Sequence, residues 1–210
     1  MLNSAPFIIA IAGPSGSGKS SFANLLREKM GRNHCQYIAL DNYYRDLRHL
    51  TSEERSVRDF DHPSAWESEL IIKHISLLKL GKFVEMPQYD FNAHLRGDLT
   101  LKINPSSIII VEGLFALCYP ELNALIDLSI FIDIDDRTAL TRRIKRDTVE
   151  RGRTESSIRS QFEGTVLPAC QKYIRPSMRA ANLDFSGDTN LVQNVGKARE
   201  EIQNRIGKRP

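Results

Sequence analysis

The chain has 210 residues, of which 41% are hydrophobic and 26% are charged, and its formal net charge is +3. These proportions are ordinary for a globular protein, and the length suits one substantial domain. No stretch approaches the roughly 18 apolar residues of a membrane span, and the apolar run from Phe7 to Ala12 is too short for a secretory signal. We therefore expect a cytoplasmic protein with no membrane partner.

The cysteines and the charge distribution exclude further classes of site and partner. Three cysteines lie far apart, without the spacing of a zinc site or a disulfide framework. Between Arg137 and Arg153, seven cations face only Asp147 and Glu150, so this segment carries +5 and the rest of the chain sums to −2. A basic segment on a nearly neutral protein indicates a local anion site and argues against a nucleic-acid partner.

Apolar runs typical of buried strands alternate along the chain with segments of helical periodicity. We predict strands over 7–12, 36–40, 83–88, 99–103, 107–111 and 128–134. Helices are predicted after the glycine loop, with Phe22 to Met30 in helical spacing, after 64, from about 136, from about 154 and over 192–206. Ser64-Ala-Trp-Glu67 has the pattern of a capping box, and a polar turn containing Gly97 joins the two middle strands. This alternation predicts an α/β fold with a parallel sheet.

The segment Gly13-Pro-Ser-Gly-Ser-Gly-Lys-Ser-Ser21 matches the pattern G-x-x-x-x-G-K-[ST] at every fixed position, between a buried strand and a helix. Backbone N–H groups of such a loop surround an anion, the lysine reaches the outer phosphates and the serine hydroxyl reaches Mg²⁺. We predict a nucleoside triphosphate site, with a flexible Gly/Ser turn as the alternative. The residues assigned to it are Gly13, Ser15, Gly16, Ser17, Gly18, Lys19, Ser20 and Ser21.

Three carboxylates follow predicted strands, where the ligands of open parallel sheets gather. Glu112, after Ile-Ile-Ile-Val, suits a Mg²⁺ ligand, directly or through water; the alternative is a solvent-exposed loop acid. Asp41 suits a base that takes a proton from an attacking hydroxyl, or a helix cap. Asp133 is the weakest candidate, and Asp135 and Asp136 resemble helix caps.

The basic segment has its own prediction. Arg142, Arg143, Lys145 and Arg146 lie within little more than one helical turn, and the glycine of Glu150-Arg-Gly-Arg153 offers a hinge. Arginines on a mobile flap close over phosphates and stabilise the charge that is transferred. We predict a lid; the alternative is a solvated basic face.

Beyond the glycine loop, five blocks resemble those of the uridine kinase (uridine–cytidine kinase) family, in order. They are Asp41-Asn-Tyr-Tyr-Arg45, Phe60-Asp-His-Pro-Ser-Ala65, Pro87-Gln-Tyr-Asp-Phe91 with His94, Glu112-Gly-Leu114, and Arg142-Arg-Ile-Lys-Arg-Asp147 through Glu150-Arg-Gly-Arg153. The resemblance covers about residues 6–174. It implies a single P-loop NTPase domain over 1–210: a parallel sheet flanked by helices, a nucleoside-binding β-hairpin insertion at 82–104 and a helical lid at about 142–165.

The resemblance also implies a reaction, which is phosphoryl transfer from ATP or GTP, with Mg²⁺, to the 5′-hydroxyl of uridine or cytidine in pyrimidine salvage. It implies a base at Asp41, with Lys19 and Arg146 as further catalytic residues. It places Arg151 and Arg153 on the nucleotide phosphates, Ser20 and Glu112 on Mg²⁺, and the nucleoside on Phe60, Asp61, Tyr89, Phe91, His94, Arg143 and Gln161. A homo-oligomer, a tetramer in the family, is a further expectation.

These roles suit the chemistry, because a carboxylate accepts from ribose hydroxyls and aromatic faces hold a base. Taken singly, Tyr89 and Phe91 suit one face of a strand equally well, and His94 suits an ordinary histidine. The stretch Leu183–Asp188 departs from the Val-Pro-Arg-Gly-like stretch of the family, in a region that approaches the nucleotide base. This departure leaves the choice between ATP and GTP open.

Two other functions remain as alternatives. A related P-loop kinase for nicotinamide riboside, pantothenate or phosphoribulose would keep the loop, the base and the lid but change the acceptor pocket. The aromatic residues at 89 and 91, together with His94, favour an aromatic base over a sugar phosphate. A nucleotide-switch ATPase is the second alternative; the chain has no Asn-Lys-x-Asp guanine motif.

Overall fold

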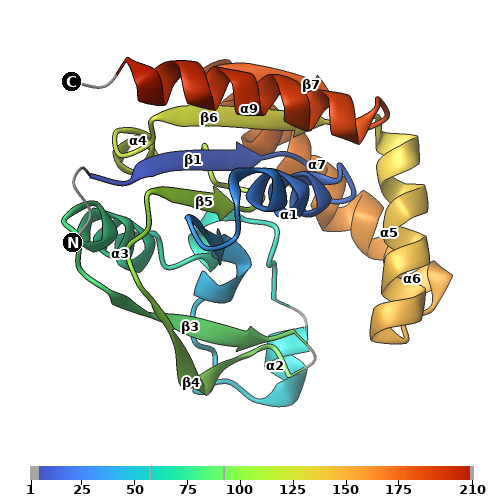
Figure 1. Cartoon of the computed structure of the whole chain (residues 1–210). Helices are drawn as coiled ribbons and strands as arrows, with labels where there is room; N and C mark the ends of the chain where they lie inside the picture. The colour runs from blue at the N-terminus through green and yellow to red at the C-terminus, as the bar shows by residue number, and fades with distance from the viewer. Residues whose placement is uncertain (1–4, 57, 92, 209–210) are drawn as a thin grey trace.

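The core of the computed structural model, which describes residues 5–56, 58–91 and 93–208, is a five-stranded parallel sheet with helices on both faces (Figure 1). Its strand order is β2-β5-β1-β6-β7, and β3 and β4 form a separate antiparallel hairpin. The strands are β1 (Phe7–Ala12), β2 (Cys35–Ala39), β3 (Val84–Asp90), β4 (Leu95–Ile103), β5 (Ile108–Glu112), β6 (Leu128–Asp133) and β7 (Leu183–Ser186). The predicted α/β fold with a parallel sheet is confirmed.

The helices connect the strands and cover the sheet. The α-helices are α1 (Lys19–Met30), α2 (Ser52–Ser56), α3 (Ser68–Lys79), α4 (Pro120–Asn123), α5 (Asp136–Arg151), α6 (Glu155–Gln161), α7 (Leu167–Ala169), α8 (Arg175–Ser177) and α9 (Leu191–Gly207). Short 3₁₀ segments are η1 (Leu40–Tyr43), η2 (Pro63–Ala65) and η5 (Met178–Ala180), and π-helical segments are η3 (Phe162–Val166) and η4 (Cys170–Ile174).

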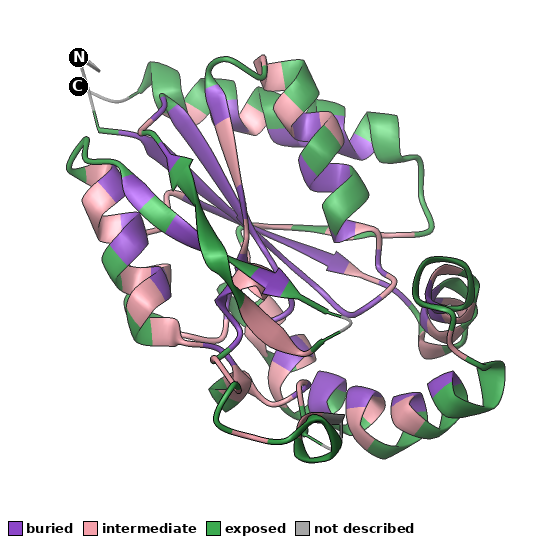
Figure 2. Cartoon of the chain, turned by 90° about the horizontal axis from the view of Figure 1, so that it is seen from below, coloured by how far each residue is buried: buried purple, intermediate pink, exposed green. Residues whose placement is uncertain are grey.

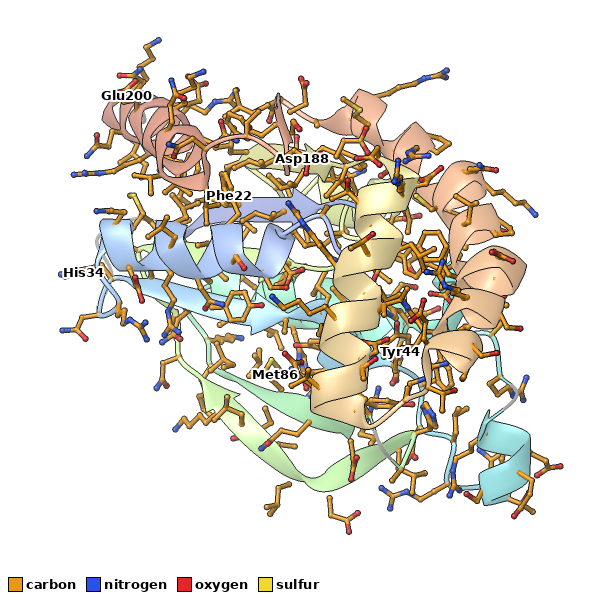
Figure 3. All side chains as sticks on the ribbon, turned by 90° about the vertical axis from the view of Figure 1, so that its right-hand side faces the viewer. Phe22, His34, Tyr44, Met86, Asp188 and Glu200 are labelled. Carbon is orange, nitrogen blue, oxygen red and sulfur yellow. The ribbon has the colours of Figure 1, made fainter. Side chains whose placement is uncertain are left out.

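Two hydrophobic cores lie on opposite faces of the sheet, because successive side chains of a strand point to opposite sides. Ile9 and Ile11 of β1 pack with α1 and α9, and Phe22 lies on the side of α1 that faces α9 (Figure 3). Ile8 and Ala10 pack with α3 and the hairpin. The inner strands β1, β5 and β6 are buried almost throughout (Figure 2), so the carboxyl edge of the sheet is a rigid base for the residues that follow these strands.

The predicted capping box is wrong, although the helix that follows exists. Helix α3 begins at Ser68, and Glu67 before it makes no side-chain capping bond. The cause is Trp66, which is fully buried and forms an isolated β-bridge with Tyr44, so the backbone there is extended. Glu67 instead ion-pairs with Arg96 at 2.7 Å.

The predicted polar turn around Gly97 is also wrong. Both strands of the hairpin are longer than expected: β3 ends at Asp90 and β4 begins at Leu95, so Gly97 lies within β4. The register shifts between Pro87 and Tyr89, opposite this part of β4. Glycine inside a strand is typical of such a bulge, and a glycine among polar residues predicts a turn equally well.

Strand β7 was not predicted from the sequence. It has only four residues, none of them fully buried, and it pairs in parallel with β6 at the edge of the sheet. A short, half-exposed edge strand lacks the apolar run that marks the inner strands. Its residues belong to the stretch Leu183–Asp188 that departs from the family pattern.

Candidate active site

The glycine loop connects the carboxyl end of β1 to the first residue of α1. Gly13 has φ +150° and lies against β6, where a Cβ would stand 2.1 Å from the Ile132 carbonyl oxygen, so only glycine fits. Gly18, with φ 89°, precedes the helix and offers no side-chain cap. The first N–H groups of α1 are therefore available to an anion, as a helix N-terminus that binds phosphate requires.

Glu112, at the end of the neighbouring strand β5, lies beside the first turn of α1. Its Oε2 accepts hydrogen bonds from the Tyr37 hydroxyl at 2.8 Å and from Ser20 Oγ at 3.2 Å. Its Oε1 lies 3.9 Å from Lys19 Nζ. The carboxylate is 5% exposed, which excludes the alternative of a solvent-exposed loop acid.

Asp41 follows β2 within the 3₁₀ turn η1, beside Lys19 and Glu112. Its Oδ1 is buried and has no hydrogen-bond partner among the described residues. Burial and the negative charge of Glu112 raise the pKa of Asp41 to about 6, against the lowering effect of Lys19 and two arginines. A carboxylate with a raised pKa and a vacant acceptor atom suits proton transfer near neutral pH.

The structure brings most of the predicted site residues together around one pocket of about 420 Å³. Among them the pocket is lined by Ser15, Lys19, Ser20, Asp41, Phe60, Asp61, Tyr89, Phe91, His94, Arg143, Arg146, Arg151, Arg153 and Gln161. Residues from the P-loop, the hairpin, the 58–61 loop and the α5–α6 region therefore converge from positions up to about 146 apart in sequence.

An aromatic cluster forms the end of the pocket next to the hairpin. The rings of Phe60 and His94 are stacked, with centroids 4.7 Å apart. Tyr44 contacts both Phe60 and Tyr89, at 5.6 and 5.2 Å between centroids. Phe91 is 41% exposed just beyond β3, so it does not continue a buried strand face. Burial lowers the pKa of His94 and keeps its imidazole neutral at pH 7.

Asp61 stands between this aromatic cluster and the arginines of α5. Thr165 of η3 donates a hydrogen bond from Oγ1 to Asp61 Oδ2 at 2.9 Å. Burial raises the pKa of Asp61, while Arg143, the Thr165 hydroxyl and Arg153 oppose that shift. A buried carboxylate with one oxygen held in place suits recognition of hydroxyl donors.

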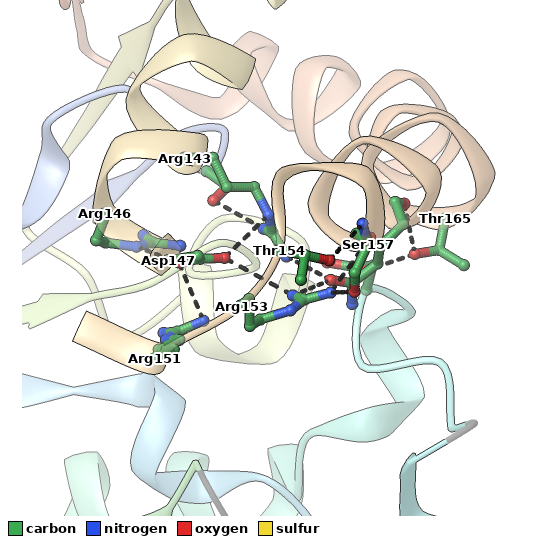
Figure 4. Close-up of polar contacts among 11 residues, drawn as sticks. Arg143, Arg146, Asp147, Arg151, Arg153, Thr154, Ser157 and Thr165 are labelled. Carbon is green, nitrogen blue, oxygen red and sulfur yellow. Dashed lines mark hydrogen bonds and ion pairs between the residues drawn. The ribbon is translucent and has the colours of Figure 1, made fainter. Parts of the chain in front are cut away.

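Four arginines of the basic segment surround one buried carboxylate, that of Asp147 (Figure 4). Arg143 also donates to Ser15 Oγ of the glycine loop at 3.1 Å and to Gln161 Oε1 at 3.0 Å. Arg153 donates to the same Gln161 oxygen at 2.6 Å. These contacts exclude the alternative of a solvated basic face for this cluster.

Not every predicted residue lies in the pocket. Arg142 does not line this pocket; it donates to the Gly16 and Gly187 carbonyls and pairs with Asp188. Asp188 lies beside the N-terminal half of α5 (Figure 3). Arg142 borders a second cavity of about 190 Å³ next to β7. Of the remaining loop residues, this second cavity is lined by Ser17, Gly18 and Ser21.

Sequence reasoning missed several residues of the site. Tyr44, Arg58 and Leu114 also line the main pocket, and two of them stand inside blocks that carried the resemblance. Asp147 was counted only as an opposing charge, and Thr165 carried no signal, because its role depends on a π-helical turn.

The residues predicted for Mg²⁺ fit a hard cation. Ser20 Oγ and Glu112 Oε2 are oxygen atoms 3.2 Å apart, and no group of three or more His, Cys, Asp or Glu side chains in the described ranges is arranged to hold a metal. Mg²⁺ is often held by few protein ligands together with phosphates and water, so a two-residue set suffices.

Within residues 5–56, 58–91 and 93–208, no helix combines the length and apolarity needed to cross a membrane. The cytoplasmic location and the oligomeric assembly stay predictions.

Solved structures support the fold. A chain from Silicibacter sp. TM1040, named for a fructose transport system kinase, matches with a TM-score of 0.71 at 22% identity, covering 86% of this chain and 90% of the other. Phosphoribulokinase from Rhodobacter spheroides matches with a TM-score of 0.65 at 16% identity, covering 87% and 70%. The architecture is thus that of P-loop kinases.

Sequence comparison supplies the family. Residues 8–192 match the model of the phosphoribulokinase/uridine kinase family. Uridine kinase from Staphylococcus aureus is 40% identical over 186 residues, which are 88% of this chain and 90% of that protein. The predicted kinase class is confirmed, and the chain belongs to the phosphoribulokinase/uridine kinase family.

Proposed function

We propose that this kinase transfers the terminal phosphate of ATP to the 5′-hydroxyl of a pyrimidine nucleoside, uridine or cytidine. The observation that carries the proposal is the pocket in which Asp41 and Lys19 stand at one end and the aromatic cluster with His94 at the other. A sugar phosphate has no ring that could stack on aromatic side chains beside a neutral imidazole, so this cluster favours an acceptor with an aromatic base. The name of the Staphylococcus aureus relative agrees with this acceptor class.

In the proposed reaction, Asp41 accepts the proton of the 5′-hydroxyl as its oxygen attacks the terminal phosphorus. The new O–P bond forms while the bond from that phosphorus to the ADP oxygen breaks, and the proton later leaves Asp41 for solvent. Lys19, Arg146 and Arg151 stabilise negative charge on the transferred group. Asp61 accepts hydrogen bonds from the ribose hydroxyls, and His94 contacts the edge of the base.

Ser20 and Glu112 are the residues that would hold Mg²⁺. The ion supplies positive charge between the outer phosphates of the nucleotide. The region at about 142–165 would act as the lid, and the β3–β4 hairpin as the acceptor-binding insertion. Arg142 and Gly187 border the second cavity, and Gly187 belongs to the stretch expected to approach the nucleotide base. The preference for ATP or GTP is therefore proposed to depend on the residues around this cavity.

The test is release of ADP from Mg-ATP with a panel of acceptors, and the same panel with Mg-GTP. The panel holds uridine, cytidine, adenosine, nicotinamide riboside, pantothenate and ribulose 5-phosphate, with a control that lacks any acceptor. Release that depends on uridine and cytidine, with UMP and CMP as products, is the expected result.

Two other results have different meanings. Release with another acceptor keeps the phosphoryl-transfer mechanism and overturns the assignment of the aromatic cluster; the family, which also contains phosphoribulokinases, makes this the second candidate. Equal release without an acceptor indicates an ATPase and overturns the proposal as a whole.

A further inference from the structure

The side chain of Asp147 is the meeting point of the basic segment, and no function has yet been assigned to it. It lies on α5 with 0% exposure. Four guanidinium groups lie within 4 Å of its carboxylate, so the local sum of these five charges is +3. Burial acts to raise its pKa, but hydrogen bonding and the charges of the arginines outweigh burial, and the pKa of Asp147 is lowered. The carboxylate is thus ionised wherever the enzyme works.

The two oxygens of this carboxylate serve different arginines. Oδ1 accepts from Arg146 Nε at 2.8 Å and lies 3.5 Å from Arg151 Nη1. Oδ2 lies 3.5 Å from Arg143 Nε and 3.8 Å from Arg153 Nη1. The contacts of Oδ2 are longer, and among the described residues this atom has no partner at hydrogen-bond geometry.

The two pairs of arginines act on different carboxylates of the pocket. Arg146 and Arg151 are the arginines whose charges act on Asp41, and Arg151 also lies 5.7 Å from the centre of the Phe91 ring. Arg143 and Arg153 are the arginines whose charges act on Asp61, and both donate to Gln161 Oε1. One pair thus acts on the carboxylate assigned as the base, and the other acts on the carboxylate assigned to the ribose and shares Gln161. Arg143 also donates to Ser15 of the glycine loop and Arg151 also lies over Phe91, so the two pairs meet in the middle of the pocket.

The backbone of Asp147 supports the same arrangement. Its carbonyl oxygen accepts hydrogen bonds from the N–H groups of Gly152 and Arg153. Gly152 has φ 61°, a left-handed conformation that ends α5 and turns the chain back. Arg153 thereby returns to the carboxylate that lies six residues before it.

We propose that Asp147 is a positioning residue that divides the four arginines between its two oxygens, one pair directed to phosphoryl transfer and the other to the nucleoside. Without it, four like charges in one place repel one another and lose their fixed directions. This inference rests on the proposed nucleoside kinase function.

The experiment compares three variants in steady-state kinetics with uridine and Mg-ATP. In Asp147→Asn the amide oxygen is expected to stay on Arg146 Nε, the shortest contact, so the amide N–H₂ faces the donors of Arg143 and Arg153. We expect the KM for uridine to rise about tenfold while kcat stays within about threefold. Asp147→Ala frees both pairs, so kcat is expected to fall by about 100-fold as well. Glu150→Gln removes the same charge from an exposed position of α5 and is expected to change neither constant by more than about twofold.

Coupling distinguishes positioning from a general loss of stability. Arg153→Met is expected to raise the KM for uridine in the wild-type background and to add little in the Asp147→Asn background, because the arginine is already released there. Full additivity of the two changes, equal losses of KM and kcat in Asp147→Asn, or the same effect from Glu150→Gln would each overturn the proposal.

A second readout depends on neither the acceptor nor the folding of a variant. In ¹⁵N spectra of the wild-type protein, the Nε–H signal of Arg146, which donates to Asp147 Oδ1, is expected to exchange slowly with water, whereas that of the exposed Arg199 exchanges fast. Fast exchange at both positions would overturn the inference. If the wild type phosphorylates no nucleoside, the proposed function fails, and these signals still decide whether Asp147 holds the arginines.

Discussion

At the scale of single residues, the site depends on two carboxylates that lie close together in different surroundings. Glu112 is surrounded by donors from Lys19, Ser20 and Tyr37. Asp41 has an oxygen without a hydrogen-bond partner among the described residues, and its pKa is raised. Neighbouring carboxylates whose environments differ in this way take different roles, one as a ligand or charge partner and the other as a base.

Replacing Asp41 is therefore expected to separate activity from stability. Asp41→Asn removes the base, and we expect kcat to fall by roughly 10²- to 10⁴-fold. Because folding raises the pKa of Asp41 from 3.8 to about 6, its ionised form destabilises the folded state. That penalty is absent below pH 3.8 and complete above about pH 6, so the variant is expected to have a higher Tm than the wild type at pH 8.

Two measurements check this prediction. The wild-type kcat/KM is expected to rise with pH through about 6, as Asp41 loses its proton. Thermal unfolding of wild type and variant at pH 5 and pH 8 tests the sign of the stability change, since the gain should shrink at the lower pH. A variant that changes KM alone, or that is less stable at pH 8, contradicts the role of Asp41 as a buried base.

His94 gives a second prediction at this scale. Its ring stacks on Phe60 at the aromatic end of the pocket, away from the glycine loop. His94→Ala is expected to raise the KM for uridine about tenfold, through loss of a hydrogen bond and of stacking, and to leave the KM for ATP within about twofold. Initial rates with each substrate varied in turn measure both constants. Equal losses for both substrates would indicate a structural role for His94.

At the scale of elements, the sequence predicts regular segments better than irregular ones. The apolar runs of β1, β5 and β6 and the glycine loop lie where they were predicted, because burial and backbone geometry leave local signals there. The predictions around Trp66 and Gly97 are wrong, because a buried aromatic ring and a β-bulge decide the local backbone there through distant contacts. The π-helical turns left no periodic signal at all.

Two prolines explain the π-helical segments once the structure is known. Prolines 168 and 176 each follow, by two residues, the end of a π-helical segment. A proline inside a helix lacks an N–H group and clashes with the carbonyl four residues earlier, and a wider turn relieves this clash. The wider turn η3 brings Thr165 to Asp61, so a feature of the helix backbone orients a residue of the pocket.

This relation predicts the effect of Thr165→Val, which keeps the shape and removes the hydroxyl. Loss of the hydrogen bond is expected to raise the pKa of Asp61 further and to raise the KM for uridine about three- to tenfold, most strongly at low pH, where the carboxylate takes up a proton. Thr165→Ser keeps the donor and serves as the matched control. A KM for uridine that is the same in both variants at every pH would show that Thr165 only packs.

At the scale of the whole molecule, the fold and the joint position of the site residues followed from the sequence, whereas their mutual geometry did not. Asp41 and Glu112 follow strands of a parallel sheet, and the carboxyl ends of such strands lie at one edge. The order of the motifs therefore places these carboxylates and the basic segment near Asp147 at the same edge. Which arginine meets which oxygen, and that Arg142 lies on the other side of the loop, depends on packing that no single segment encodes.

The proposed nucleotide and Mg²⁺ site predicts how the stability of the whole molecule responds to ligands. In the described ranges no cluster of metal-ligating side chains supports the fold, so a chelator is expected to leave the Tm of the free protein unchanged. Mg-ATP at about 100 times its Kd stabilises the folded state by about 2.7 kcal/mol, which for a chain of this size raises the Tm by about 5–10 °C. ATP with the chelator is expected to give a much smaller shift, because Glu112 and the phosphates then lack the cation between them.

Thermal shift measurements with Mg-ATP, ATP plus EDTA, and EDTA alone test this prediction. Lys19→Ala is the matched variant, since it keeps the glycine loop and removes the cation that reaches the outer phosphates. Its Tm without ligand is expected to stay within a few degrees of the wild type, about 1 kcal/mol or less, while the Mg-ATP shift and turnover are lost. An undiminished Mg-ATP shift in Lys19→Ala would place the nucleotide elsewhere on the molecule, and a fall in Tm with EDTA alone would reveal a metal that holds the fold together.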